Sequence, residues 1–160
     1  MSVNKYEPHI FIIPEDDNFR QLVLGFKNDS RVNDAVVKLE SNARGWMDAL
    51  GKIKHIHMDD YEKRYAIALI DFDGEPDNRI DYFRREIPAY EGRAFLLGLY
   101  KESEDFKRDC KKKSLEALGM ELAESCIGGG GGLWESEHLK CNAEELDRLR
   151  KAVGSFLFLE

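Results

Sequence analysis

A run of five apolar residues that ends in two acids and a glycine places the strongest constraint on how this chain folds. The run spans residues 66–70, and Asp71, Phe72, Asp73 and Gly74 follow it. A short apolar run that stops at such residues is typical of a buried β-strand. Because side chains alternate along an extended chain, Asp71 and Asp73 are predicted to point to the same side. Two neighbouring carboxylates at the end of a buried strand repel each other, and a bound cation relieves that repulsion.

The pattern of a short apolar run followed by a helical segment repeats along the chain. The predicted strands span residues 9–13, 32–39, 66–70 and 93–100, and the predicted helices between them span residues 15–27, 41–53 and 76–86. Strands that alternate with helices form a parallel sheet with helices on both faces. We therefore predict a single α/β domain with a mostly parallel sheet of four to five strands.

The segment after the fourth strand is predicted to be helical. Ser103 is expected to cap a long helix that continues to Leu122, with Gly119 dividing or weakening it. This helix begins in the predicted core, about residues 8–110, and continues into a helical C-terminal extension, about residues 111–160.

Three further features define the extension. Five consecutive glycines, at positions 128–132, predict a flexible loop. Asn142 and Glu145 have the spacing of a capping box, which predicts the start of the last helix. Residues 156–159 are apolar and are expected to form a tail or an edge strand packed on the core.

Composition narrows the functional classes. The net charge is -7 and the pI about 5.2, which argues against a protein that binds nucleic acid through a strongly basic surface. The three cysteines form no CxxC pair, the first residues form no signal peptide, and no apolar run approaches the ~20 residues of a membrane helix. We expect a soluble, cytoplasmic protein that does not associate with membranes.

A second acid occupies a position like that of Asp71. Glu15 comes directly after the first predicted strand, 56 positions before Asp71. Ligands of open α/β sheets bind at the carboxyl ends of the strands. If the first and third strands are neighbours, Glu15, Asp71 and Asp73 converge there and can hold Mg²⁺, with Mn²⁺ as the alternative ion. The competing interpretation is that these acids only cap the helices that follow them.

The segments IIPEDDNFRQLV and ALIDFDG resemble the motifs of the Toprim domain of topoisomerases, bacterial-type primases and small nucleases. The resemblance covers about residues 8–110. It implies that Glu15 is the acid/base or metal-binding glutamate and that Asp71 and Asp73 bind the metal. The chain differs at Asp16, where family members usually have a glycine directly after the glutamate.

Further candidate residues follow the fourth predicted strand. Glu102 and Glu104 resemble the additional acid of some Toprim nucleases, which implies a second metal position; as helix-capping acids they would need no ion. A basic stretch is predicted to contact the phosphate backbone, unless it is only the solvated face of a helix: Lys101, Lys107, Arg108, Lys111 and Lys112.

These features predict Mg²⁺-dependent phosphoryl transfer on nucleic acid, and the resemblance favours a Toprim-type nuclease. One alternative is a catalytically inactive Toprim-like module that binds or regulates a protein partner, which the acidic composition and Asp16 favour. Another is a small-molecule phosphatase of the haloacid-dehalogenase type, whose first motif is similar to Asp71-Phe72-Asp73-Gly74. In that class, however, the motif normally lies on the first strand.

Overall fold

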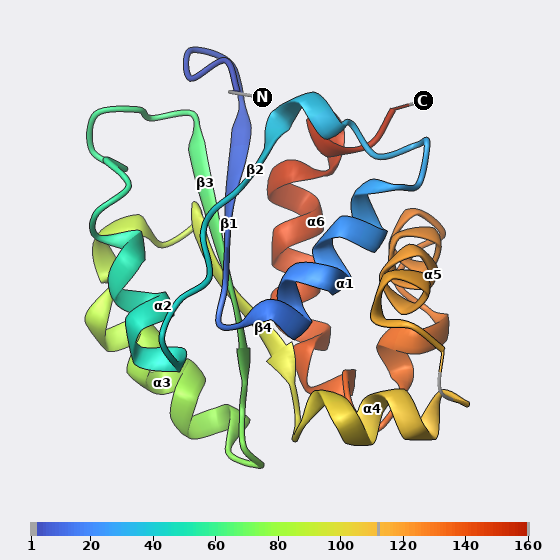
Figure 1. Cartoon of the computed structure of the whole chain (residues 1–160). Helices are drawn as coiled ribbons and strands as arrows, with labels where there is room; N and C mark the ends of the chain where they lie inside the picture. The colour runs from blue at the N-terminus through green and yellow to red at the C-terminus, as the bar shows by residue number, and fades with distance from the viewer. Residues whose placement is uncertain (1–2, 112, 160) are drawn as a thin grey trace.

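A four-stranded parallel sheet forms the centre of the molecule in the computed structural model, which describes residues 3–111 and 113–159 (Figure 1). The strands are β1 (His9–Pro14), β2 (Val37–Leu39), β3 (Arg64–Asp71) and β4 (Ala94–Leu99). They pair in the order β2-β1-β3-β4, and all three pairings are parallel. The predicted α/β class and parallel sheet are confirmed.

Six α-helices surround this sheet within the described residues. They are α1 (Asp17–Lys27), α2 (Trp46–Ile53), α3 (Pro76–Glu86), α4 (Ser103–Asp109), α5 (Leu115–Ile127) and α6 (Ala143–Leu157). Short 3₁₀ turns span Asp34–Val36, Pro88–Tyr90, Gly132–Glu135 and Lys140–Asn142. Helices α2 and α3 cover one face, α1 and α6 cover the other with α5 beyond α1, and α4 lies at the carboxyl end of the sheet (Figure 1). None of these helices is both long and apolar enough to cross a bilayer.

Each face of the sheet has its own hydrophobic core because alternate strand residues point in opposite directions. Ile67 and Leu97 point toward α1, α5 and α6, whereas Ala68 and Leu96 point toward α2 and α3. The β3 strand is the central element of both cores and is paired on both edges. A continuous apolar sequence is what burial on both faces requires, which explains the composition of residues 66–70.

Two glycines allow α1 and α5 to approach each other closely. A Cβ atom on Gly25 would lie 1.9 Å from the Glu116 carbonyl oxygen, and one on Gly119 would lie 2.0 Å from that of Leu22. The predicted division of the helix at Gly119 is wrong, since α5 is continuous through this position. Gly119 is needed for packing between helices rather than for a helix end.

Two predicted elements are shorter in the structure. Only residues 37–39 of the predicted strand at 32–39 pair with β1, because the Asp34–Val36 segment forms a 3₁₀ turn. The predicted long helix from Ser103 ends at Asp109, and a new helix begins at Leu115 with the Ser114 hydroxyl accepting from the Ala117 N–H. Ser103 is not the cap: it is the first helical residue, and its buried hydroxyl accepts a 2.8 Å hydrogen bond from the Asn18 side chain.

The last helix begins where the sequence predicts, but its two signal residues do not form a capping box. Asn142 instead donates to the Gly98 carbonyl (2.7 Å) and accepts from the Gly98 N–H (2.9 Å). Glu145 accepts from the Leu96 N–H at 3.1 Å. These side chains occupy the outer edge of β4 in place of a fifth strand, which satisfies buried backbone groups and protects the edge. The tail forms a single antiparallel bridge, between Phe158 and Val32.

Candidate metal centre

The carboxyl ends of β1 and β3 meet at the point where the chain changes direction across the sheet. From β1 the chain continues to β2 on one side, and from β3 it continues to β4 on the other. In open α/β sheets such a point leaves a crevice in which ligands bind. The acids predicted from the first and third strands are therefore brought to neighbouring strand ends.

Glu15 is held by the end of β3. Its backbone N–H donates to the Leu69 carbonyl at 2.9 Å, which continues the pairing of β1 with β3 by one residue. Its side-chain Oε2 accepts a 2.7 Å hydrogen bond from the Asp71 N–H. Burial raises the pKa of Glu15, and the Asp71 N–H opposes that shift because it stabilises the carboxylate. Glu15 Oε1 has no protein partner within the described residues.

Asp71 is the most perturbed acid of the group. It is the last residue of β3, and its Oδ1 atom is buried with no hydrogen-bond partner in the described part of the chain. Burial, followed by the nearby Glu15 and Asp16 carboxylates, raises the pKa of Asp71 to about 7. A buried polar atom without a partner is costly, so this oxygen is expected to have a ligand or proton that satisfies it.

Asp16 is the third member of the group. From the sequence it was predicted only to be an acid at the start of the first helix and a departure from the family pattern. It is the N-cap of α1, where its Oδ1 accepts from the N–H groups of Asn18 (3.0 Å) and Phe19 (3.2 Å). Its φ of -153° is extended backbone, so a glycine is not required at this position. The sequence contained the signal for this capping role, because an acid directly before an amphipathic helix is a typical N-cap.

Glu15, Asp16 and Asp71 each offer a carboxylate oxygen, and these oxygens lie within 4.8 Å of one another. Oxygens that share an octahedral Mg²⁺ at ~2.1 Å lie up to ~4.2 Å apart, so small side-chain movements suffice to close this group around one ion. Three carboxylates provide the hard oxygen ligands and the negative charge that a divalent cation requires. We refer to these three residues as the acidic triad, and it could hold a metal.

Asp73 lies outside the acidic triad. The strand ends at Asp71, and Asp73 adopts a left-handed conformation with φ of 50°, so strand alternation no longer sets its direction. Its Oδ2 forms a 2.9 Å ion pair with Arg79, which also donates to the Asp71 carbonyl oxygen. The Arg79 guanidinium in turn lies over the Trp46 ring, 4.2 Å from its centroid.

The other predicted site residues lie around α4. Glu102 is the N-cap residue of α4 without a side-chain cap bond, and its charge contributes to the raised pKa of Asp71. Glu104 is exposed in the first turn of the same helix. Lys101 and Lys111 are exposed outside the helix, Lys107 is half-buried, and Arg108 is exposed and paired with Asp105 at 2.8 Å. Lys112 lies outside the described residues.

Comparisons with known proteins identify no relative. The chain matches no protein-family model, no curated protein and no solved structure. The interpretation of the acidic triad therefore depends on its chemistry and position alone.

Proposed function

We propose that the acidic triad binds Mg²⁺, or Mn²⁺ in its place, and that the bound ion supports phosphoryl transfer on nucleic acid in the manner of a Toprim-type nuclease. The observation that carries this proposal is the buried, unpartnered Oδ1 of Asp71 beside two other carboxylates. A divalent cation would supply the missing partner and remove the repulsion that raises the pKa of Asp71.

The three carboxylates are suited to different roles. Asp71 is the principal ligand, because its oxygen is buried and directed by the end of β3. Asp16 contributes its second oxygen, since Oδ1 is engaged by the start of α1. Glu15 is fixed through Oε2, which leaves Oε1 either to complete the metal shell or to act as general base toward an attacking water.

Arg79 offers a link between the ion and the substrate. Its guanidinium is largely buried and lies between Asp73 and the Trp46 ring. A phosphate that approaches the acidic triad would compete with Asp73 for this guanidinium, which binds phosphate oxygens in the same geometry as carboxylate oxygens. Release of Asp73 would in turn free its carboxylate for the ion, as the Toprim resemblance implies.

A metal-binding module without catalysis is the second candidate, and the charges around α4 favour it. Arg108 is paired with Asp105 and lies near Asp109, and Lys113 is paired with Glu121. The basic residues that would attract a phosphate backbone are thus partly neutralised by their neighbours. Nucleic-acid binding of such a protein would depend on a partner that supplies positive charge.

Two measurements test the proposal in sequence. Mg²⁺ and Mn²⁺ are first titrated into the wild-type protein, Asp71→Asn and the control Asp81→Asn, which is an exposed acid on α3, with melting temperature and NMR chemical shifts as readouts. We expect stabilisation of the wild type and the control, and its loss in Asp71→Asn. The wild type is then incubated with DNA, RNA and a chromogenic phosphate ester in Mg²⁺.

The outcomes separate the candidates. Cleavage of DNA or RNA that is lost in Asp71→Asn supports the nuclease, and metal binding without cleavage supports the inactive module. Hydrolysis of the phosphate ester alone indicates a phosphatase. If no metal changes the melting temperature or the spectra of the wild-type protein, the metal centre itself is excluded.

A further inference from the structure

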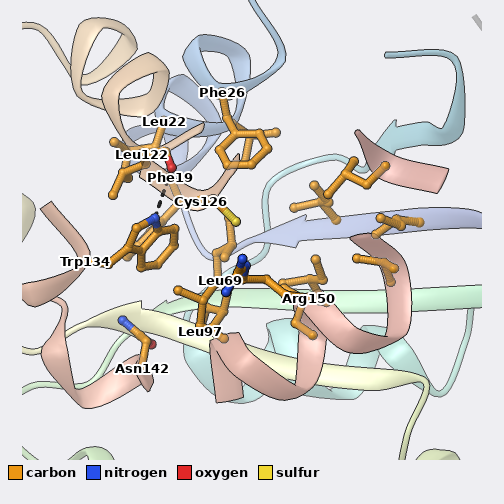
Figure 2. Close-up of a pocket in the computed structure, with 18 of the residues that line it drawn as sticks. Phe19, Leu22, Phe26, Leu69, Leu97, Leu122, Cys126, Trp134, Asn142 and Arg150 are labelled. Atoms are coloured by element: carbon orange, nitrogen blue, oxygen red, sulfur yellow. Dashed lines mark hydrogen bonds between the residues drawn. The ribbon is translucent and has the colours of Figure 1, made fainter. Parts of the chain in front are cut away.

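A cavity of about 110 Å³ lies between the sheet and the helices α1, α5 and α6 (Figure 2). Its walls are formed by aliphatic and aromatic side chains from β1, β3 and β4 and from these three helices, including Leu69, Leu97 and Leu122. Protein interiors are normally packed without voids of this size. An apolar cavity of ~150 Å³ remains dry and accepts benzene, so this smaller cavity is of a size to accept a short alkyl chain.

One charged side chain of the cavity wall has no counter-ion. Arg150 on α6 lines the cavity, and its guanidinium lies near Cys126 (Figure 2). It donates a 3.0 Å hydrogen bond to the Gly129 carbonyl and also interacts with the Cys126 thiol, and it forms no ion pair with any residue that the structure describes. Burial raises the pKa of Cys126 to about 11, so this neighbouring thiol is neutral and does not balance the charge.

The other cation of the wall is already neutralised. Lys27, at the end of α1, forms a 3.0 Å ion pair with Asp34. Arg150 is therefore the cation available to a bound group. A guanidinium has five N–H donors in a planar arrangement that fits a carboxylate, and most of those donors are not used by the protein here.

The glycine run leaves this guanidinium uncovered. Arg150 and Trp134 also line a surface hollow of about 290 Å³ that includes Gly129 and Gly130, so these two side chains lie between the hollow and the cavity. A Cβ atom on Gly130 would lie 3.7 Å from Arg150 Nη1, and a longer side chain would extend over the guanidinium. Gly129 and Gly130 have φ values of 113° and 95°, which favour glycine at both positions. The backbone of this loop thus keeps the entrance beside Arg150 free of side chains.

We propose that this cavity binds an amphipathic monocarboxylate, with its alkyl chain between the sheet and α1, α5 and α6 and its carboxylate on Arg150. Transfer of the chain out of water supplies the affinity, and the guanidinium supplies the selectivity for an anionic head group. This site is on the opposite face of the sheet from α2 and α3 and involves none of the acidic triad, so it stands independently of the proposed metal centre.

Fluorescence of Trp134 tests the proposal directly. Trp134 lines the cavity and donates to the Leu122 carbonyl at 3.0 Å. In a Trp46→Phe background it is the remaining tryptophan. Butanoate, hexanoate and octanoate, each below its micellar concentration, are titrated into the protein separately, and 1-hexanol is the uncharged comparison. Because the cavity is small, we expect saturable spectral change and affinity that rises from butanoate to hexanoate but no further at octanoate. Hexanoate should bind at least about tenfold more tightly than hexanol.

Two variants and one control locate the ligand. Arg150→Gln should lower hexanoate affinity to that of hexanol or below and leave hexanol affinity unchanged. The control Lys54→Gln, the same charge change at an exposed position after α2 on the other face of the sheet, should leave both unchanged. Leu69→Phe, which adds volume within the cavity, should weaken both ligands. Circular dichroism and the melting temperature establish that each variant is folded.

Three results would overturn the inference. The first is the absence of any saturable response to hexanoate in the Trp46→Phe protein. The second is equal affinity for hexanoate and hexanol with no effect of Arg150→Gln, which would remove the guanidinium from the site. The third is unaltered binding by folded Leu69→Phe, which would place the ligand outside the cavity.

Discussion

The Asp71 N–H donates a 2.7 Å hydrogen bond to Glu15 Oε2, so a side chain from the end of β1 takes the place of a backbone acceptor at the end of β3. This bond holds the Glu15 carboxylate next to that of Asp71 although the two repel each other. Both acids consequently have raised pKa values, and both are arranged before any ligand arrives. Such preorganised charge is expected of a cation site and is an unfavourable arrangement for stability alone.

The raised pKa of Asp71 predicts a pH-dependent stability. The folded state binds a proton at Asp71 up to about pH 7, whereas the unfolded state releases it near the ordinary value of 3.8. The favourable contribution of the protonated Asp71 to the free energy of unfolding is therefore fully present below about pH 4 and is lost as the pH rises to about 7. In metal-free buffer, Asp71→Asn should stabilise the protein more at pH 8 than at pH 5, by about 1–3 kcal/mol.

Urea unfolding of the wild type and Asp71→Asn at both pH values measures this difference. Glu104→Gln, an exposed acid on α4, is the control and should show little change. The raised pKa of Asp71 is contradicted if the wild type and Asp71→Asn differ in free energy of unfolding by the same amount at pH 5 and at pH 8.

Asp16 allows the roles of helix cap and metal ligand to be separated. Asp16→Ser keeps a side-chain oxygen for the N–H groups of Asn18 and Phe19 but removes the carboxylate from the acidic triad. We expect a free energy of unfolding within about 0.5 kcal/mol of the wild type without metal and Mg²⁺ affinity at least about tenfold weaker. Asp16→Ala removes both the cap and the metal ligand, so we expect weaker Mg²⁺ binding and a loss of about 1 kcal/mol in the free energy of unfolding from the missing cap.

Isothermal titration with Mg²⁺ and urea unfolding distinguish the two effects. Undiminished Mg²⁺ binding by Asp16→Ser would remove Asp16 from the ligand set and leave it as a cap only.

The close contact of α1 with α5 predicts a large cost for a single methyl group. Gly25→Ala would place Cβ 1.9 Å from the Glu116 carbonyl oxygen, so the helices must separate. We expect a loss of about 2–4 kcal/mol in the free energy of unfolding. Gly154→Ala is the matched control, because a Cβ atom on this helical glycine would meet no atom within 4 Å, and it should stabilise α6 by about 0.5–1 kcal/mol. Equal effects of the two substitutions in denaturant unfolding would contradict the packing argument.

The hydrogen bonds between Asn142 and Gly98 predict that the edge of β4 depends on one side chain. Asn142→Ala removes the partners of a buried N–H and a buried carbonyl, at a cost of about 2–4 kcal/mol. The Gly98 amide should then exchange faster with deuterium than it does in the wild type. Asn78→Ala, on the exposed surface of α3, is the control. Unchanged protection of Gly98 would show that α6 covers the edge without the Asn142 bonds.

Local patterns determined which segments of this chain are strands and helices. The apolar run at 66–70 predicted a strand buried on both faces, and the spacing of Phe19, Leu22 and Val23 predicted α1, because both signals depend on periodicity within a few residues. The same patterns predicted that Glu15 and Asp71 lie at strand ends. They could not predict that α4 ends at Asp109 and α5 begins at Leu115, because no proline in the sequence separates the two helices.

The tertiary structure decided which of these residues meet. Asn142 and Glu145 have the local spacing of a cap, yet the edge of β4 lies within reach and offers buried backbone groups that cost more when left unsatisfied. Likewise the acids of the candidate centre are Glu15, Asp16 and Asp71, because strand order places β1 beside β3 while the turn after Asp71 directs Asp73 to Arg79. Contacts between residues far apart in the chain depend on strand order and turn geometry, which short-range patterns do not encode.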